Sequence, residues 1–276
     1  MTDGQGKIAG QVAAGSAGGI TRRRFLRIVG SGVIAGSFGL LFSDRLLEIV
    51  GYSPTDIRTV SGQERQWVMV IDLARCDGCG KCTLGCNREH FVPEGQEWIK
   101  VLRVRDDLGS EYYLPRPCMN CVNAPCVKVC PVGATFRRDD GVVLIDHDRC
   151  IGCRYCMAAC PYNARYFNWE EPAHSPEELA HEYSVEEPWP HRVGTVEKCT
   201  FCAHYAKRGM LPACVRACTE EMGSGVIYFG DLREDAVSNG VETLPLTKSL
   251  RERGGFRFKE ELGTHPHVWY LAPRRG

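Results

Sequence analysis

The sequence predicts an α+β fold of two small cysteine-rich modules, one inserted in the other, with small antiparallel sheets, short helices and many loops. Three observations lead to this prediction. The 276 residues include 16 cysteines, short strand-like stretches alternate with the cysteines, and no long helical pattern separates them. A chain that is 43% hydrophobic and 25% charged has ordinary globular composition.

The first 45 residues differ in composition from the rest. Residues 1–20 are rich in Gly, Ala, Ser and Gln, which predicts a disordered lead. Thr21-Arg22-Arg23-Arg24-Phe25-Leu26-Arg27 then precedes an uncharged apolar run over 28–42, a pattern that resembles a twin-arginine export signal. As a helix this run would span about 22 Å, less than the ~30 Å core of a bilayer. We therefore expect a signal, or an uncleaved membrane anchor, rather than an amphipathic core helix.

Strand-like stretches follow from residue 66 onward. They are rich in β-branched and aromatic residues and are expected at 67–72, 98–104, 142–146, 225–229, 256–262 and 267–271. Residues 169–197 are rich in Pro and Glu, and a solvated acidic loop is the favoured interpretation over a docking surface. The outer module is assigned to 66–117 with 190–276, and the inserted module to 118–168.

The cysteines fall into four groups of four, and none is left over for a disulfide or a stray thiol. The first and third groups have the spacing C-x2-C-x2-C-x3-C, the second C-x2-C-x4-C-x3-C, and the fourth has eleven residues between its middle pair. The groups are Cys76, Cys79, Cys82 and Cys86; Cys118, Cys121, Cys126 and Cys130; Cys150, Cys153, Cys156 and Cys160; and Cys199, Cys202, Cys214 and Cys218.

These spacings are typical of iron-sulfur ligation. In two-cluster ferredoxins, three cysteines of a C-x2-C-x2-C-x3-C-P motif bind one 4Fe-4S cluster and the last one reaches the neighbouring cluster, so the motifs work in pairs. Pro131 and Pro161 close the second and third groups, whereas Asn87 and Thr219 stand in that place after the first and fourth. The groups could pair sequentially, but this difference favours nested pairing, second with third and first with fourth.

Two other uses of cysteine fit the pattern less well. Structural zinc can be held by two C-x2-C pairs, but such sites need neither the third cysteine nor the C-x3-C-P ending. Disulfides are compatible with export, but cysteines repeated at i and i+3 have poor bridging geometry. Both alternatives are less favoured than iron-sulfur clusters.

Together the motifs resemble a known family, the four-cluster iron-sulfur subunits of molybdopterin oxidoreductase complexes. The resemblance rests on the three cysteine loops starting at Cys76, Cys118 and Cys150 and on Lys198-Cys199-Thr200-Phe201-Cys202, and it covers roughly residues 66–230. It implies two ferredoxin-like modules and four 4Fe-4S clusters. The implied ligand sets are Cys76, Cys79, Cys82 with Cys218; Cys199, Cys202, Cys214 with Cys86; Cys118, Cys121, Cys126 with Cys160; and Cys150, Cys153, Cys156 with Cys130.

The resemblance also implies a function, the relay of single electrons between a polytopic quinone-binding membrane subunit and a molybdopterin catalytic subunit. The apparent twin-arginine signal predicts that the mature domain faces the periplasm or the outer surface of the membrane, because that route exports proteins already folded around their cofactors. We find no catalytic residues, and His204 is expected beside the ligands or on the surface. Lys plus Arg equals Asp plus Glu at 34 each, so charge does not indicate a nucleic-acid partner. The alternatives are a subunit of a hydrogenase or another respiratory complex, and a cluster-bearing redox sensor.

Overall fold

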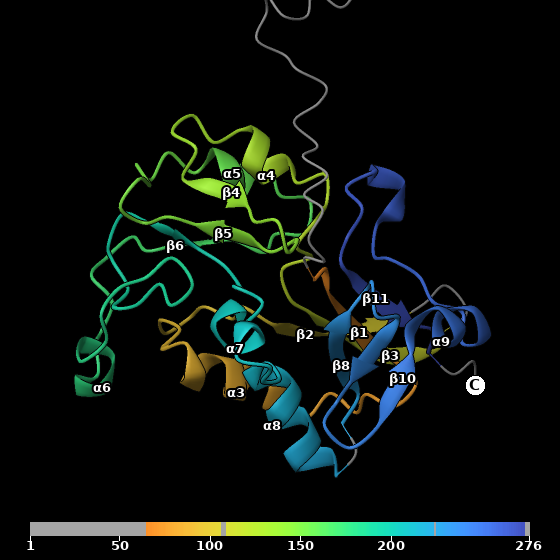
Figure 1. The fold of residues 1–276 in the computed structure, drawn as a ribbon. Coiled ribbons are helices and arrows are strands. Elements are labelled where there is room, and N and C mark those ends of the chain that lie inside the picture. The colour runs from red at the N-terminus through yellow and green to blue at the C-terminus, as the bar shows by residue number, and fades with distance from the viewer. Residues whose placement is uncertain (1–64, 106–108, 224, 274–276) are drawn as a thin grey trace, which may run out of the picture. The chain divides into compact units, whose positions relative to one another are not determined.

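A five-stranded sheet is the largest sheet in the computed structural model, which describes residues 65–105, 109–223 and 225–273. The strand order is β10-β9-β8-β1-β11 (Figure 1). Its strands are β1 (Trp67–Asp72), β8 (Ile227–Asp231), β9 (Ala236–Ser238), β10 (Thr243–Pro245) and β11 (Val268–Leu271). The central strand β1 pairs antiparallel with β8 and parallel with β11. The sheet therefore joins the start of the described chain to its end.

Strand β1 is buried on both faces, which explains why its sequence is a continuous apolar run. Met69 and Ile71 face the main core, which also contains many of the cysteines. Val68 and Val70 face a second, smaller core that includes Leu246 of helix α9 (Leu246–Glu252). One strand thus holds a cysteine-rich layer on one side and an aliphatic layer on the other.

The remaining elements are short and surround the cysteines. Three two-stranded ribbons are β2 (Lys100–Arg105) with β3 (Glu111–Arg116), β4 (Thr135–Arg137) with β5 (Val143–Ile145), and β6 (Tyr166–Phe167) with β7 (Val196–Glu197). The helices are α3 (Lys81–Glu89), α4 (Pro125–Lys128), α5 (Tyr155–Ala158), α6 (Pro176–Leu179), α7 (Ala203–Lys207) and α8 (Ala213–Met222), with a 3-10 turn at Glu260–Leu262.

Two helix pairs bring distant cysteines together. Helix α3 packs along α8, and α4 packs against α5. At Gly85 the backbones of α3 and α8 approach so closely that a Cβ atom would collide with the Cβ of Ala217. These contacts place the first cysteine group beside the fourth and the second beside the third.

Most of the predicted strands are present, with ends displaced by one or two residues. The strand predicted at 256–262 is wrong: Phe256 makes an isolated bridge to Tyr270, and Glu260–Leu262 is a 3-10 turn. The expectation of small antiparallel sheets is confirmed for the three ribbons but is wrong for the largest sheet, because β1 and β11 are parallel. The predicted signal or anchor within residues 1–45 lies outside the described residues.

The expectation of a solvated acidic loop at 169–197 is wrong for two of its glutamates. Glu178 and Glu197 are each 1% exposed. The Glu178 carboxylate accepts a hydrogen bond from the backbone N–H of His191, and a carboxylate oxygen of Glu197 lies 2.6 Å from Nδ1 of the same histidine. His191 lies in the same segment, so the two carboxylates fold the segment around it, and Nε2 of His191 lies 2.7 Å from the backbone carbonyl of His90 outside the segment.

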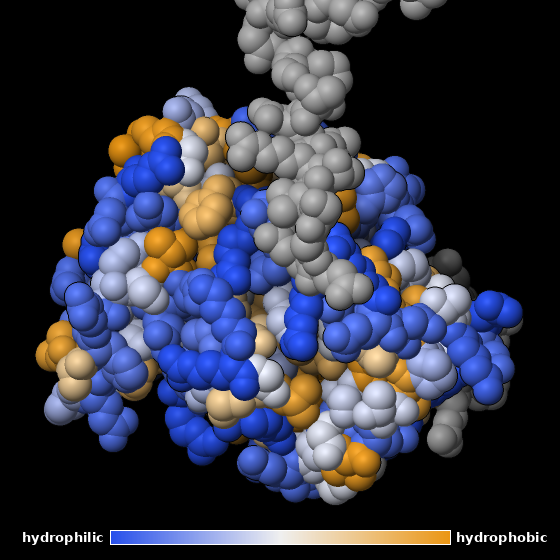
Figure 2. Space-filling view, viewed as in Figure 1, coloured by the Kyte–Doolittle hydropathy of each residue, from blue (hydrophilic) through white to orange (hydrophobic). Residues whose placement is uncertain are grey.

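Within the described ranges, no helix has both the length and the apolar character needed to cross a bilayer. On the face drawn in Figure 2, hydrophobic residues form separate spots among hydrophilic ones.

The hydroxyl of Tyr270 provides a test of how β11 is fixed. It is fully buried and donates a 3.0 Å hydrogen bond to the backbone carbonyl of Pro115 at the end of β3. We expect Tyr270→Phe to lower the free energy of unfolding by about 1–3 kcal/mol, because the carbonyl stays buried without its donor. For a chain of this size that is a fall of roughly 2–4 °C in Tm for each kcal/mol, measurable by circular dichroism.

The matched control is Tyr155→Phe, because the Tyr155 side chain is largely exposed and its hydroxyl can be replaced by water contacts. Equal Tm values for the two variants would contradict the role given to the buried bond.

Candidate metal centres

The structure brings all sixteen predicted cysteines together in four sets of four, which we name quartets 1 to 4. Quartet 1 is Cys76, Cys79, Cys82 and Cys218; quartet 2 is Cys86, Cys199, Cys202 and Cys214; quartet 3 is Cys118, Cys121, Cys126 and Cys160; quartet 4 is Cys130, Cys150, Cys153 and Cys156. In each set three thiols come from one cysteine group and the other comes from a different group. All sixteen lie within the described residues, and none of them forms a disulfide.

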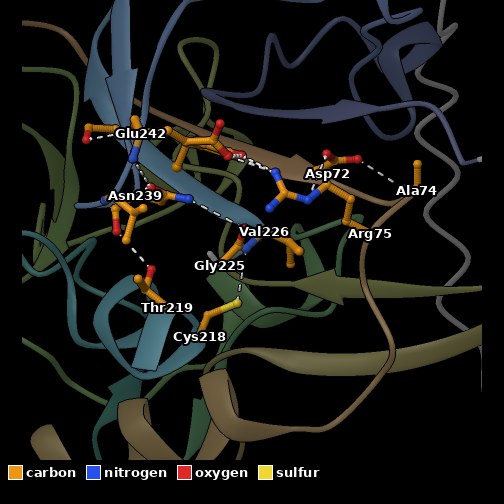
Figure 3. Close-up of polar contacts among 12 residues, drawn as sticks. Asp72, Ala74, Arg75, Cys218, Thr219, Gly225, Val226, Asn239 and Glu242 are labelled. Carbon is orange, nitrogen blue, oxygen red and sulfur yellow. Dashed lines mark hydrogen bonds and ion pairs between the residues drawn. The ribbon is translucent and has the colours of Figure 1, made fainter. Parts of the chain in front are cut away.

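Quartet 1 surrounds a small cavity between α3 and α8. The cavity is closed by Val101, Pro115 and Met222, so its wall beyond the thiols is largely apolar. The backbone N–H of Val226 donates to the Cys218 sulfur at 3.3 Å. Figure 3 shows how the turn before Val226 is held: Asn239 Nδ2 donates to the carbonyl of Gly225, and Thr219 Oγ1 donates to that of Asn239.

The same view shows the polar group that holds the loop entering quartet 1 (Figure 3). Arg75, which directly precedes Cys76, is paired with the Glu242 carboxylate at 2.8 Å and donates to the Tyr228 hydroxyl at 2.7 Å. Asp72 Oδ1 accepts from the backbone N–H of Ala74 at 3.1 Å. The loop is therefore attached to β8 and to the turn after β9, independently of any bound group.

Quartet 2 is the most deeply enclosed. All four of its cysteines are buried, and Cys202 takes a left-handed conformation with φ 48° at the start of α7. The backbone N–H of Phe201 points to the Cys199 sulfur at 3.4 Å, and His90 Nε2 lies 3.1 Å from the sulfur of Cys202. Burial lowers the pKa of His90 to about 3, so the ring is neutral and can donate only from one nitrogen.

Quartets 3 and 4 share the packed pair of helices α4 and α5. Cys126 lies on α4 and Cys156 on α5. In quartet 4, Cys130 differs from most of the other cysteines, because its pKa is lowered: partial burial acts to raise it, but the backbone N–H groups of Val132, Ala134 and Thr135 together outweigh that effect. Hydrogen bonds of this kind stabilise a thiolate.

For most of the remaining cysteines whose pKa is shifted, burial opposes the thiolate. It raises the pKa of Cys82 to about 12, that of Cys121 to about 12 and that of Cys199 to about 11. A metal reverses this balance, because a coordinating thiol is deprotonated outright. Four soft thiolates, peptide N–H groups aimed at sulfur and an apolar wall are what an iron-sulfur cluster requires. The quartets fit that group.

A single metal ion fits less well. Across the described residues, no group of three or more His, Cys, Asp or Glu side chains converges closely enough to hold one ion. The thiols instead stand around cavities, as seen for quartets 1 and 4.

Neighbouring quartets lie close together in the order 1, 2, 3, 4. Cys86 of quartet 2 is near enough to Cys82 of quartet 1 to affect its own pKa. The same holds for Cys199 of quartet 2 with Cys118 of quartet 3, and for Cys156 of quartet 4 with Cys126 of quartet 3. Each quartet thus has a neighbour on the path from quartet 1 to quartet 4.

Near quartet 2, the sequence analysis missed one histidine and left two options open for another. His90 was not singled out, although its position four residues after Cys86, at the end of the same helix, was a usable signal. His204 is 4% exposed and packs against His90, with ring centroids 5.5 Å apart. The surface option for His204 is therefore wrong, and the option beside the ligands is the one that fits.

Comparison with known proteins also indicates the binding of 4Fe-4S clusters. Residues 110–175 and residues 149–222 each match a family model described as a 4Fe-4S dicluster domain. A Halobacterium salinarum protein named as an iron-sulfur subunit of dimethyl sulfoxide reductase is 44% identical over 219 residues, 74% of this chain and 78% of its own length. A tetrathionate reductase subunit of Salmonella typhimurium is 37% identical, over 75% of this chain and 72% of its own.

A third relative is the iron-sulfur cluster-binding subunit of menaquinone reductase from Nitratidesulfovibrio vulgaris. It is 39% identical over 239 residues, which are 76% of this chain and 89% of the relative.

The loop of quartet 4 has a tight point that can be tested at Gly152. Its φ is +66°, and a Cβ there would collide with the carbonyl oxygen of Gly194. We expect Gly152→Ala to combine a strained left-handed backbone, about 1–2 kcal/mol, with overpacking of about 1–3 kcal/mol. The loss of stability would be measured as a fall in Tm.

Gly80 is the matched control, because it also lies in a cysteine loop with φ +73° but has open space where a Cβ would be. Gly80→Ala should show the backbone strain alone. If both variants lose the same stability, the contact between the quartet 4 loop and Gly194 is not a constraint on the fold.

Proposed function

This chain belongs to the family of ferredoxin-type 4Fe-4S electron-transfer subunits of molybdopterin oxidoreductase complexes, and from that premise we propose that it relays single electrons through four 4Fe-4S clusters. The observation that best supports this proposal is that the sixteen thiols form four quartets with none left over. Bound clusters supply one-electron chemistry. The chain contributes thiolate ligands, N–H groups that stabilise them, and walls that exclude water.

In this proposal each quartet binds one cluster, so that the ligand sets cross between cysteine groups. The packing of α3 on α8 and of α4 on α5 supports nested pairing. One ferredoxin-like module is then built from 66–117 with 190–276, and a second, over 118–168, is inserted in it. In segment 169–197 the carboxylates of Glu178 and Glu197 hold His191, whose Nε2 lies 2.7 Å from the backbone carbonyl of His90 in the outer module.

The names of the relatives support the proposed partners. Two of them are subunits of reductases, for dimethyl sulfoxide and tetrathionate. We therefore propose that one end of the relay faces a molybdopterin catalytic subunit and the other a quinone-reactive membrane subunit. The linear order of quartets supports a path with two ends.

A second candidate keeps electron transfer and changes the partner. The relative named as a subunit of menaquinone reductase supports a respiratory complex of another kind. The two candidates differ in which purified subunit co-elutes with the full chain: a molybdenum-containing protein supports the first, and a complex without molybdenum supports the second.

We also propose that the chain is exported by the twin-arginine route to the outer face of the cytoplasmic membrane. The support is the sequence Thr21-Arg22-Arg23-Arg24-Phe25-Leu26 before an apolar run. Residues 1–45 would be the signal, either removed or kept as an anchor.

Iron analysis combined with cysteine variants tests the cluster proposal. Four cubanes give about sixteen iron and as many acid-labile sulfides per chain. We expect Cys79→Ser and Cys218→Ser to alter the same signal in electron paramagnetic resonance, because both residues belong to quartet 1. Cys86→Ser should alter a different signal, although Cys86 shares α3 with Cys82. Each variant should retain at least about three quarters of the iron, because three of the four clusters keep all their ligands.

The control is Leu84→Ala, an exposed position on the same helix, which should leave every signal unchanged. About four zinc ions without sulfide, as four structural zinc sites would give, would overturn the function. A Cys218→Ser variant that alters the signal assigned to Cys86 would overturn the crossed ligand sets instead.

Export is tested in the full chain by replacing the arginine pair. We expect the double variant Arg22→Lys with Arg23→Lys to remain in the cytoplasm, because the pair is the defining feature of the signal. Cell fractionation with protease accessibility provides the measurement. Arg24→Lys, at the variable position of the pattern, should be exported normally. Equal export of both variants would refute the proposed route.

A further inference from the structure

Arg165 lies between quartets 3 and 4 and is almost completely buried. It follows the third cysteine group by five residues and is 3% exposed. Its guanidinium lies close enough to Cys126, on α4, and to Cys156, on α5, to influence both thiols. These two thiols belong to different quartets. One side chain therefore neighbours ligands of two of the four proposed clusters.

Among the residues that the structure describes, no carboxylate is paired with Arg165. The groups that act most strongly on its guanidinium are Cys126, Cys156 and Cys118, and no Asp or Glu is among them. Within the described part of the chain, its Nη2 atom is buried without a hydrogen-bond partner. A buried cation without a counter-charge is costly. The thiolates, and the group that they hold, are the counter-charge.

The pKa of Arg165 agrees with this geometry. Burial alone would lower its pKa, but the neighbouring cysteines outweigh burial and raise it. The guanidinium keeps its proton in any case, because arginine is effectively always protonated in proteins.

A hydrogen-bond chain extends the reach of Arg165 to a third ligand. Nη1 donates to Thr135 Oγ1 at 3.2 Å, and the backbone N–H of Thr135 points to the Cys130 sulfur at 3.4 Å. Cys130 belongs to quartet 4 and is the cysteine whose thiolate is favoured by peptide N–H groups. Arg165 thus fixes the residue that orients this ligand.

We propose that Arg165 is a positioning residue for the step between quartets 3 and 4, and that its fixed positive charge favours the reduced state of both clusters. The inference rests on the proposed function. Reduction adds one negative charge to a site, and a nearby cation stabilises that charge most strongly where water is excluded. The donor site loses one electron, the acceptor site gains it, and no proton moves because the guanidinium stays charged throughout.

The test is a redox titration of the full chain followed by electron paramagnetic resonance. Signals of quartets 3 and 4 are first identified as those altered in Cys126→Ser and Cys156→Ser. We expect Arg165→Gln to lower the midpoint potential of both signals, with at least a tenfold change in the ratio of oxidised to reduced cluster, about 59 mV for one electron. Signals of quartets 1 and 2 should shift much less, and iron content should be retained.

Arg192→Gln is the matched control, because it removes an arginine that is paired with Asp148 at the surface. It should leave all four potentials unchanged. Arg165→Lys keeps the charge and should hold both potentials near those of the wild type. Arg165→Met removes the charge as Arg165→Gln does, and is the variant used if Arg165→Gln does not assemble.

Unchanged potentials in Arg165→Gln with full iron content would overturn the proposal. Where only Arg165→Met assembles, potentials of quartets 3 and 4 that match the wild type would do the same. A wild-type chain without iron-sulfur signals would instead overturn the proposed function, so the two failures are distinguishable.

Discussion

A thiol must lose its proton to bind iron, and burial makes that loss unfavourable, so a protein that buries its cysteines depends on the metal to stabilise them. Most of the cysteines here are buried, and they make up a large part of the main core. In the absence of iron, the raised pKa of residues such as Cys82 and Cys121 keeps them as neutral thiols around cavities. Binding free energy is then also folding free energy. Because metal binding then contributes to the free energy of folding, the short helices and ribbons around the quartets are sufficient to stabilise the fold.

The scaffold also supplies the fourth cysteine of each site, because a loop with three cysteines needs one more ligand from another part of the chain. Helices α3 and α8 lie far apart in sequence, and their close approach at Gly85 brings Cys218 to the loop that begins at Cys76. Strand β1 precedes that loop and β8 follows α8, and the two strands pair directly. The sheet therefore fixes the helix pair from behind. Peptide N–H groups, such as that of Val226 toward Cys218, complete each site after the backbone has been positioned.

The sequence analysis correctly predicted those features that are encoded by neighbouring residues in the chain. The cysteine spacing and the apolar run of β1 are each contained in a few consecutive residues, and both led to the structure that is observed. His90, Arg165 and Glu178 were not identified, because each acts through a residue that only the fold brings near: Cys202, Cys126 and His191. A polar residue that will be buried looks like an exposed one in a single sequence. The parallel pairing of β1 with β11 was missed for the same reason, since it joins the two ends of the described chain.

The exposure of the quartets differs in the way that a relay requires. Quartet 2 is wholly buried, and quartet 3 has three buried members, whereas Cys79 of quartet 1 is exposed and three cysteines of quartet 4 are half-buried. Terminal sites of a relay must be reached by a partner, and internal sites must be shielded from water and from stray oxidants. The two internal quartets also have the strongest protein environments, with His90 beside quartet 2 and Arg165 beside quartet 3. In the proposed relay, the permanently charged guanidinium of Arg165 exchanges no proton when an electron passes. The step beside quartet 3 would then move an electron without moving a proton.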